Sequence, residues 1–211
     1  MIPFPTVQLK QPIPAGPCKW NPGVVTDSGS ITSLFSANDN LLFISAFGGG
    51  GIATSTLGTT GKSSGKLYFE IQFEQSEAGA QGIGIAQAVN PVSPYKFGGS
   101  GHGVQYSSDG SLVDVDTFGT IANYTPPIYT GAGSFVAQFA ADLDSLLIWA
   151  GSNGVMVGNP AAGTGGQSII AGTYYPAIWL HPQPSTTISG DGFFSQGQFR
   201  YGPPVGFSQW R

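Results

Sequence analysis

Charged residues are scarce in this sequence of 211 residues. Asp, Glu, Lys and Arg together make up 9% of it, against roughly 25% in an average soluble domain. The net charge is −4 at pH 7, and no cluster of Lys and Arg offers the counterion release that drives binding to phosphates. These features argue against a nucleic-acid partner. The surface must owe its polarity to Ser, Thr, Asn, Gln and the backbone, which suits a protein covered by partners.

Cysteine is nearly absent, because Cys18 is the only one. A single cysteine excludes an internal disulfide and any multi-cysteine zinc site, and we expect it to be an unreactive thiol. Long apolar runs are also missing. The first five residues lack both a basic region and an uninterrupted apolar stretch, and no later stretch reaches about 18 apolar residues. We therefore expect no signal peptide and no membrane insertion.

Glycine and proline, in contrast, are abundant, with 33 and 16 copies. Both residues interrupt long helices and favour tight turns, so helical bundles and coiled coils are poor candidates. All-β domains commonly reach this length undivided, and we expect one such domain over residues 18–211. Residues 1–17 carry several prolines and predict an extended arm that docks on a partner or packs on its own domain. The prolines of this arm are Pro3, Pro5, Pro12, Pro14 and Pro17.

The clearest predicted strand covers residues 66–74. Its apolar residues alternate with polar ones, which predicts one core face and one wetter face. The core face would carry Leu67, Phe69, Ile71 and Phe73, and the wetter face Tyr68, Glu70, Gln72 and Glu74. Further strands are predicted at residues 41–44, 82–86, 104–106, 112–113 and 174–180.

Residues 134–150 contain neither Gly nor Pro, and their apolar spacing fits a helix as well as a hairpin. We favour a hairpin for three reasons. Phe135, Ala137 and Phe139 alternate strictly with other residues, residues 142–145 form a polar turn candidate, and Asn153-Gly154 predicts a second tight turn. Asp109-Gly110 predicts a further hairpin turn.

Several of these segments, in this order, resemble the SPRY family over roughly residues 62–207. The resemblance begins with Gly65-Lys66-Leu67-Tyr68-Phe69-Glu70-Ile71 and Gly82-Ile83-Gly84-Ile85. It continues through Tyr106, Asp109-Gly110, Asp142-Leu143-Asp144, Ile148-Trp149, Asn153-Gly154 and Tyr175-Pro176-Ala177, and ends with Phe199-Arg200-Tyr201-Gly202-Pro203-Pro204-Val205-Gly206-Phe207. It implies an all-β fold, a two-sheet antiparallel β-sandwich of the concanavalin A-like jelly-roll type, and binding of a partner through loops at one end. It supplies no catalytic residues.

The low charge, the arm and the segment Cys18-Lys19-Trp20-Asn21-Pro22 resemble stand-alone SPRY proteins of tailed phages and prophages. This resemblance implies a virion-associated attachment, fibre or decoration protein, made in the host cytoplasm. We expect the arm to bind other virion proteins and the domain to bind a host-surface protein or glycan, with self-association also compatible. We expect no cofactor and no bound metal. A carbohydrate-binding lectin is the alternative function.

The strongest enzymatic pattern is Glu70-Ile71-Gln72-Phe73-Glu74, which resembles the E-x-D-x-E strand of laminarinase-type glycosidases, with Gln72 in place of the central Asp. A regular strand separates positions 70 and 74 by about 13 Å between Cα atoms, whereas retaining chemistry needs carboxyl groups about 5 Å apart. We therefore expect two solvated glutamates. An open cleft lined by both would favour the glycosidase.

Other patterns indicate no reaction. Gly61-Lys62-Ser63 ends like a P-loop, but Thr56 replaces its first glycine and a strand is predicted to follow. His102 and His181 lie near Gly or Pro, without a nucleophile elbow, and we expect both in loops. Two carboxylate pairs could hold calcium on a strand face, although turn capping explains them more simply. These pairs are Asp114 with Asp116 and Asp142 with Asp144.

The predicted binding surface consists of the two longest irregular stretches, residues 88–101 and 117–133. Their aromatic side chains offer large, rigid contact areas. The candidate binding residues are Tyr95, Lys96, Phe97, Phe118, Tyr124 and Tyr129. Alternatively, these stretches fold back and cover a sheet edge.

Overall fold

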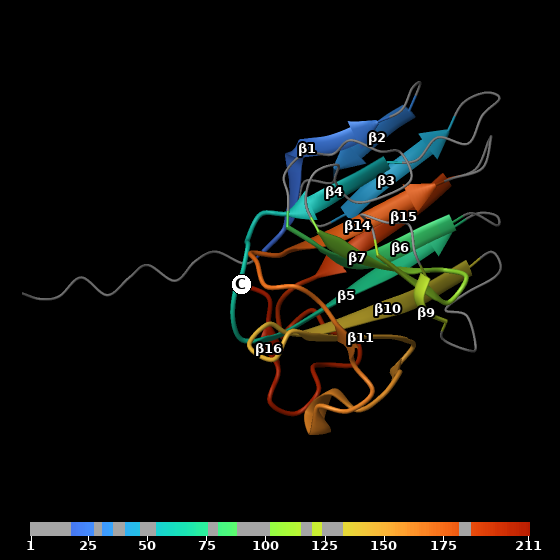
Figure 1. Ribbon diagram of the computed structural model, residues 1–211. Helices are drawn as coiled ribbons and strands as arrows, with labels where there is room; N and C mark the ends of the chain where they lie inside the picture. The colour runs from blue at the N-terminus through green and yellow to red at the C-terminus, as the bar shows by residue number, and fades with distance from the viewer. Residues whose placement is uncertain are drawn as a thin grey trace, which may run out of the picture.

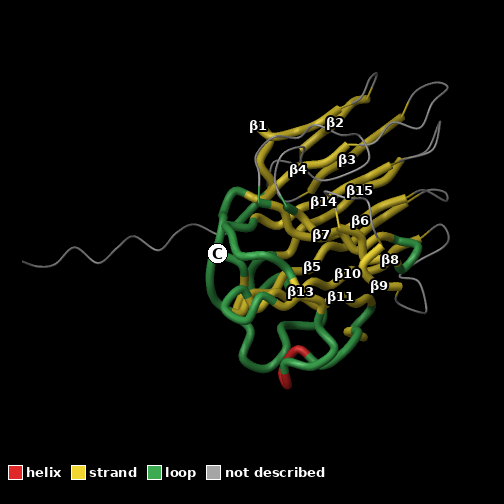
Figure 2. Tube along the Cα trace, viewed as in Figure 1, coloured by secondary structure: helices red, strands yellow, loops and turns green. Residues whose placement is uncertain are grey.

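The computed structural model describes residues 18–27, 31–35, 41–46, 54–75, 80–87, 102–114, 120–123, 133–181 and 187–211. Within these ranges the chain forms two β-sheets that lie face to face (Figure 1). A tube representation coloured by secondary structure shows the same arrangement (Figure 2). The predicted arm, residues 1–17, lies outside the described residues, so the division between residues 17 and 18 stays a prediction. No helix within the described ranges is long and apolar enough to cross a membrane.

In the described part of the chain, the first sheet has seven strands. In spatial order they are β1 (Trp20–Asp27), β4 (Thr54–Gly58), β14 (Tyr175–His181), β6 (Ala80–Ala86), β7 (Gly103–Ser107), β8 (Ser111–Asp114) and β9 (Thr120–Asn123). All of these neighbours pair antiparallel. Pro176 stands near the start of β14, before the pairing with β4 begins at Ala177, where its missing N–H costs little.

The second sheet has nine strands within the described ranges. Its main path is β12 (Val155–Met156), β11 (Leu147–Ser152), β10 (Gly133–Asp142), β5 (Lys66–Gln75), β15 (Thr187–Phe193), β3 (Leu41–Ala46) and β2 (Ile31–Phe35). Beside this path, β13 (Gln167–Ser168) pairs with β11, and β16 (Ser208–Gln209) pairs parallel to β5. A 3-10 helix, η1 (Pro160–Ala162), follows β12. The remaining pairs of this sheet are antiparallel.

The core lies between the sheets, as the alternation predicts. Phe69, Ile71 and Phe73 of β5 are buried there, together with Ile83 and Ile85 of β6. At one end, an aromatic group closes the core: the Phe69 ring lies 5.8 Å from Phe194 and 5.7 Å from Trp210, and Trp20 meets Phe194 edge-on at 4.9 Å. Cys18 is buried beside this group, and burial raises the pKa of its thiol. A neutral, buried thiol is unreactive.

The prediction of a wetter face on β5 is wrong for half of that face. Tyr68 and Glu70 are completely buried, while Gln72 is half-buried and Glu74 is exposed. The reason is a second, smaller hydrophobic cluster on the outside of the sheet, in which Tyr68 packs with Trp149 and with Phe207 of the C-terminal segment. This segment crosses the sheet after β15 and returns to pair as β16 with residues 67 and 68 of β5.

The predicted hairpins are confirmed. β10 pairs with β11 from Ala137 to Asp142, so residues 134–150 form a hairpin and not a helix. Asn153 (φ 48°) and Gly154 (φ 88°) make the tight turn into β12, because a turn with two positive φ values matches the twist of its strands. The turn at Asp109-Gly110 joins β7 to β8, with the Asp109 carboxylate accepting from the Ser111 N–H.

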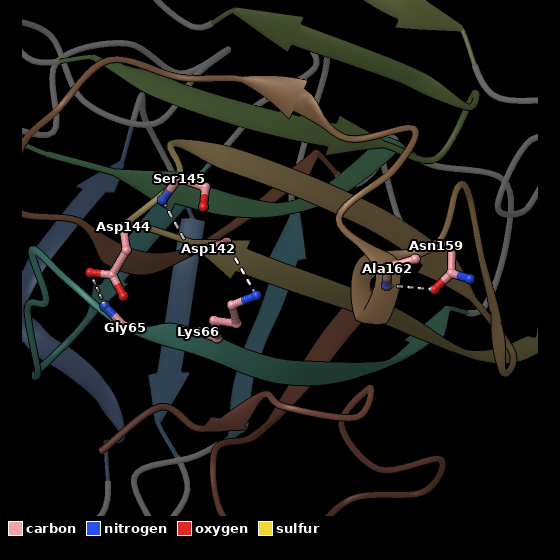
Figure 3. A network of polar contacts seen from close by, with 7 residues as sticks. All are labelled: Gly65, Lys66, Asp142, Asp144, Ser145, Asn159 and Ala162. Carbon is pink, nitrogen blue, oxygen red and sulfur yellow. Dashed lines mark hydrogen bonds and ion pairs between the residues drawn. The ribbon is translucent and has the colours of Figure 1, made fainter.

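Asp142 and Asp144 cap the turn between β10 and β11 and do not share a strand face (Figure 3). The Asp142 carboxylate accepts a hydrogen bond from the Ser145 N–H at 3.0 Å and lies 3.2 Å from the Lys66 ammonium. Asp144 accepts from the Gly65 N–H at 3.0 Å. Burial raises the pKa of Asp142, but the Ser145 hydrogen bonds and Lys66 outweigh it and lower the pKa below the ordinary value of 3.8. The interpretation as turn caps is therefore confirmed.

We expect the Asp142→Asn substitution to lower the free energy of unfolding by about 1 kcal/mol at pH 7. The substitution removes a negative charge, and this charge both attracts Lys66 and strengthens the hydrogen bond from Ser145. A carboxylate with a depressed folded-state pKa stabilises the fold above its unfolded pKa. The difference from the unsubstituted protein should therefore disappear as the pH falls below 3.8. Urea unfolding of the two proteins at pH 7 and at a pH below 3.8 measures this difference in stability. The control is Asp144→Asn, which keeps an oxygen that can accept from the Gly65 N–H. An equal loss of stability in this control would contradict the role assigned to the Asp142 charge.

Candidate functional site

The six candidate binding residues all lie outside the described residues. Tyr95, Lys96 and Phe97 belong to the undescribed range 88–101, and Phe118, Tyr124 and Tyr129 flank β9. They remain predictions. The stretch 117–133 is not irregular throughout, because β9 pairs with β8 within it. Asp116 also lies outside the described residues.

Glu70 and Glu74 do not line a common cleft. Both Glu70 oxygens are buried and hydrogen-bonded: Oε2 accepts from the Arg200 N–H at 2.7 Å, and Oε1 accepts from the N–H groups of Tyr201 and Gly202 at 3.1 and 3.0 Å. The Tyr68 hydroxyl donates to Oε1 as well, at 2.8 Å. Glu74 is exposed and accepts from Gln72. The expectation of two solvated glutamates is therefore wrong for Glu70, and the condition set for the glycosidase is not met.

The other chemical patterns are placed as follows. β5 follows Gly61-Lys62-Ser63, so this P-loop resemblance leads into a strand, as expected. His102 precedes β7 and lies 6.4 Å from the Tyr174 ring, whereas His181 is the last residue of β14, so the expectation of a loop is wrong for His181. Among the described residues, no group of three or more His, Cys, Asp or Glu side chains could hold a metal ion.

A cleft with a volume of about 430 Å³ lies on the outer side of the second sheet. One wall is formed by residues 154–156 of the hairpin turn and β12 and by residues 158–161 leading into η1, and the other by residues 201–205 of the C-terminal segment. Gln138 of β10 lines it between them. Figure 1 shows the orange η1 and the red C-terminal segment together at the lower end of the molecule. We call this feature the Tyr201 cleft.

A chain of hydrogen bonds fixes the two walls relative to the sheet. The Gly154 N–H donates to Gln138 Oε1 at 2.7 Å, Gln138 Nε2 donates to the Tyr68 hydroxyl at 2.8 Å, and that hydroxyl donates to Glu70. Glu70 in turn holds residues 200–202. Burial, reinforced by the Glu70 carboxylate, raises the pKa of Tyr68, so its hydroxyl stays protonated and can donate. The hairpin wall and the C-terminal wall are thus connected through β5 and β10.

One local feature brings the walls close together, and another orders the wall that leads into η1. A Cβ atom on Gly154 would lie 2.8 Å from Cδ1 of Tyr201, so this turn needs glycine both for its positive φ and for contact with the ring. On the η1 side, Asn159 caps the 3-10 helix by accepting from the Ala162 N–H at 3.1 Å (Figure 3). The backbone of Asn159 also pairs with Thr164, whose carbonyl accepts from the Trp149 indole at 3.0 Å.

Exposed apolar side chains concentrate at the Tyr201 cleft. Val155 is 71% exposed, Val205 85% and Tyr201 50%. These are three of the five large hydrophobic residues exposed among those described, and the other two, Ile121 and Ile170, do not line the cleft. Such concentrations mark binding sites more often than scattered apolar residues do.

The Arg200 side chain lies away from the cleft. The Arg200 side chain lies over Phe193 of β15, 5.0 Å from the ring centroid, and donates to Gln72 at 3.3 Å. Because β15 and β10 flank opposite edges of β5, Arg200 points away from the walls formed by residues 154–161. Burial raises the pKa of Asp191 on β15, and Arg200 partly opposes this effect. No residue that lines the cleft carries a formal charge at neutral pH.

The Tyr201 cleft cannot be predicted from local sequence patterns. Its walls correspond to the Asn153-Gly154 turn and to the end of the SPRY resemblance, but nothing in the sequence pairs them. The only available signal was Glu70, a charged residue within the SPRY-like strand whose partner was unknown. The bonds from Glu70 to residues 200–202 join positions 130 to 132 apart in the sequence.

Comparison with known proteins gives similarity in structure alone. No protein-family model matches the chain, and no curated protein sequence matches it. The carbohydrate recognition domain of Emp47p superposes with a TM-score of 0.51 at 11% identity, covering 82% of this chain and 89% of that one. The SPRY domain of human HERC1 gives 0.46 at 12% identity (82% and 96%), and lectin I-B4 from Griffonia simplicifolia gives 0.49 at 10% (81% and 92%). The predicted all-β, two-sheet sandwich is confirmed.

We expect Glu70→Gln to lower the free energy of unfolding by about 2 kcal/mol, because the amide nitrogen would face a backbone N–H with no acceptor between them. Amide hydrogen exchange at residues 200–202 should accelerate, which identifies release of the C-terminal wall. Chemical denaturation and exchange rates measure the two effects. Glu74→Gln, at an exposed position of the same strand, should change stability by less than about 0.5 kcal/mol. Equal effects of the two substitutions would contradict the role of Glu70.

Proposed function

We propose that this protein is a non-enzymatic binding module that recognises a partner through a preformed surface. The observation that carries the proposal is the use of Glu70: the buried carboxylate binds three successive backbone N–H groups and holds exposed Tyr201 in place. Because both oxygens of Glu70 are occupied by hydrogen bonds within the protein, this side chain has a structural role. A surface ordered before binding loses less conformational entropy when the partner arrives.

The similarity of fold is compatible with this function. Solved structures with the same sandwich include proteins described as a SPRY domain and as a carbohydrate recognition domain. At 10 to 12% identity they support the architecture and no particular ligand. A sandwich is a rigid scaffold that leaves recognition to loops and to its outer faces.

The biological setting that we propose is a phage particle. The protein would be a virion-associated attachment, fibre or decoration protein, with residues 1–17 bound to other virion proteins and the domain facing outward. The low content of charged residues and the prolines of the arm support this placement, since a proline-rich segment loses less conformational entropy on docking than a flexible chain does. Residues 88–101 and 117–133 would add further contact area.

Deletion of residues 1–17 should abolish incorporation into particles and leave the domain folded. The described core begins with Cys18 and Trp20, so none of the described contacts would be removed. Incorporation is measured by gel analysis of purified particles, and folding by the thermal unfolding transition. An unchanged amount of truncated protein in particles would refute the docking role of the arm.

A lectin is the second candidate function, and one observation favours it: the Tyr201 cleft combines an exposed aromatic ring with uncharged polar groups. Sugar sites typically have this composition, because a few directed hydrogen bonds fix orientation while apolar surface supplies contact. This candidate can coexist with the phage setting, in which a host-surface glycan would be the receptor.

A further inference from the structure

The Tyr201 cleft selects against anionic ligands. None of its lining residues carries a formal charge at neutral pH, the Arg200 side chain lies over Phe193, and the buried Glu70 carboxylate is bonded to residues 200–202. An anionic group that enters such a cleft loses hydration without gaining an opposite charge. Phosphorylated, sulfated and acidic ligands therefore do not fit it.

Tyr201 provides a flat surface in a fixed position. One side of its ring lies against Gly154, its backbone is held by Glu70, and half of the side chain remains exposed. Its orientation is therefore set before any ligand binds. Aromatic rings held in this way stack against flat, weakly polar surfaces, and Tyr adds a hydroxyl for a hydrogen bond. The C–H face of a pyranose ring is such a surface.

An amide group is available for hydroxyl recognition on the other wall. Asn159 is exposed, and its Oδ1 accepts from the Ala162 N–H, which fixes the plane of the amide. Within the described residues its Nδ2 donors stay open to a ligand. Gln138 is buried between the walls, with Oε1 bonded to Gly154 and Nε2 to Tyr68, so it supports the site from below. One oriented amide and one aromatic ring match a ligand that has hydroxyl groups around an apolar face.

The dimensions favour a small ligand over a folded protein. The volume of about 430 Å³ falls within the range of roughly 300–1,000 Å³ that is typical of small-molecule sites. A stable protein interface buries about 1,200–2,000 Å² in total, whereas the exposed apolar surface here is limited to Val155, Tyr201 and Val205. The cleft alone is too small to hold a protein partner.

We infer that the Tyr201 cleft binds a neutral oligosaccharide, with Tyr201 stacking on a sugar ring and the amide of Asn159 donating to its hydroxyl groups. Val155 and Val205 contact the apolar edges of the ligand. The inference rests on the proposed function as a binding module and names the ligand class of one site on it. None of the residues that line the cleft belongs to the stretches 88–101 and 117–133.

The test uses the full-length protein on an array of neutral, sialylated and sulfated glycans, followed by calorimetry with the best neutral oligosaccharide. Tyr201→Ala should weaken binding about tenfold, and Tyr201→Phe, which keeps the ring, should stay within about threefold. Val205→Arg places a charged, bulky side chain at the rim and should abolish binding. Ile170→Ala, at a position that is 55% exposed and outside the cleft, is the matched control and should have no effect.

A thermal unfolding transition shows that each variant is folded. Each binding result then supports or refutes the inference. Neutral-glycan binding that survives both Tyr201→Ala and Val205→Arg would remove the site from the cleft. Binding only to sialylated or sulfated glycans would refute the ligand class. A flat array would refute the inference, and if Val205→Arg also blocked capture of a virion or host protein, the cleft would belong to a protein partner. Because incorporation into particles is measured separately, these failures leave the proposed function standing.

Discussion

Among the described residues, no cationic side chain is bonded to the buried Glu70 carboxylate, and the backbone of residues 200–202 supplies the hydrogen bonds that make its burial tolerable. A buried charge is stable in a protein only when it is fully hydrogen-bonded. The C-terminal segment is therefore a necessary part of the sheet to which Glu70 belongs. Removing the segment would leave the Glu70 carboxylate without the backbone N–H groups that bind it.

This constraint determines the outer face of the second sheet. With residues 200–202 fixed, Phe207 covers Tyr68 and Trp149, and the chain reaches β5 again to pair as β16. The Tyr201 cleft forms where this segment faces the Asn153-Gly154 turn, and the Gln138 and Tyr68 hydrogen bonds connect the two walls. A cleft whose walls share one network is already ordered before a ligand binds, which is the property that a recognition site needs.

Local patterns predicted many strands and the hairpins that join neighbours in sequence, but not β1, β2, β4, β9 or β15. The alternation in residues 66–74 and the turns at Asp109-Gly110, at 142–145 and at Asn153-Gly154 gave strands and hairpins that the structure confirms. The prediction failed where a distant segment changed an environment. Glu70 and Tyr68 alternate like solvent-facing residues, yet a segment about 130 positions later covers them. His181 stands before Pro182, which favours a loop, but pairing with β6 extends β14 through it.

Side-chain periodicity and turn residues, which act over a few positions, were enough to predict the all-β class, the positions of the hairpins and the core face of β5. Which charged group is buried, which segment covers it and where the exposed apolar residues gather became known from the folded chain. The Glu70 hydrogen bonds join residues about 130 positions apart, and the Tyr201 cleft lies between two segments that are distant in the sequence. Local residue patterns carry no information about such long-range contacts.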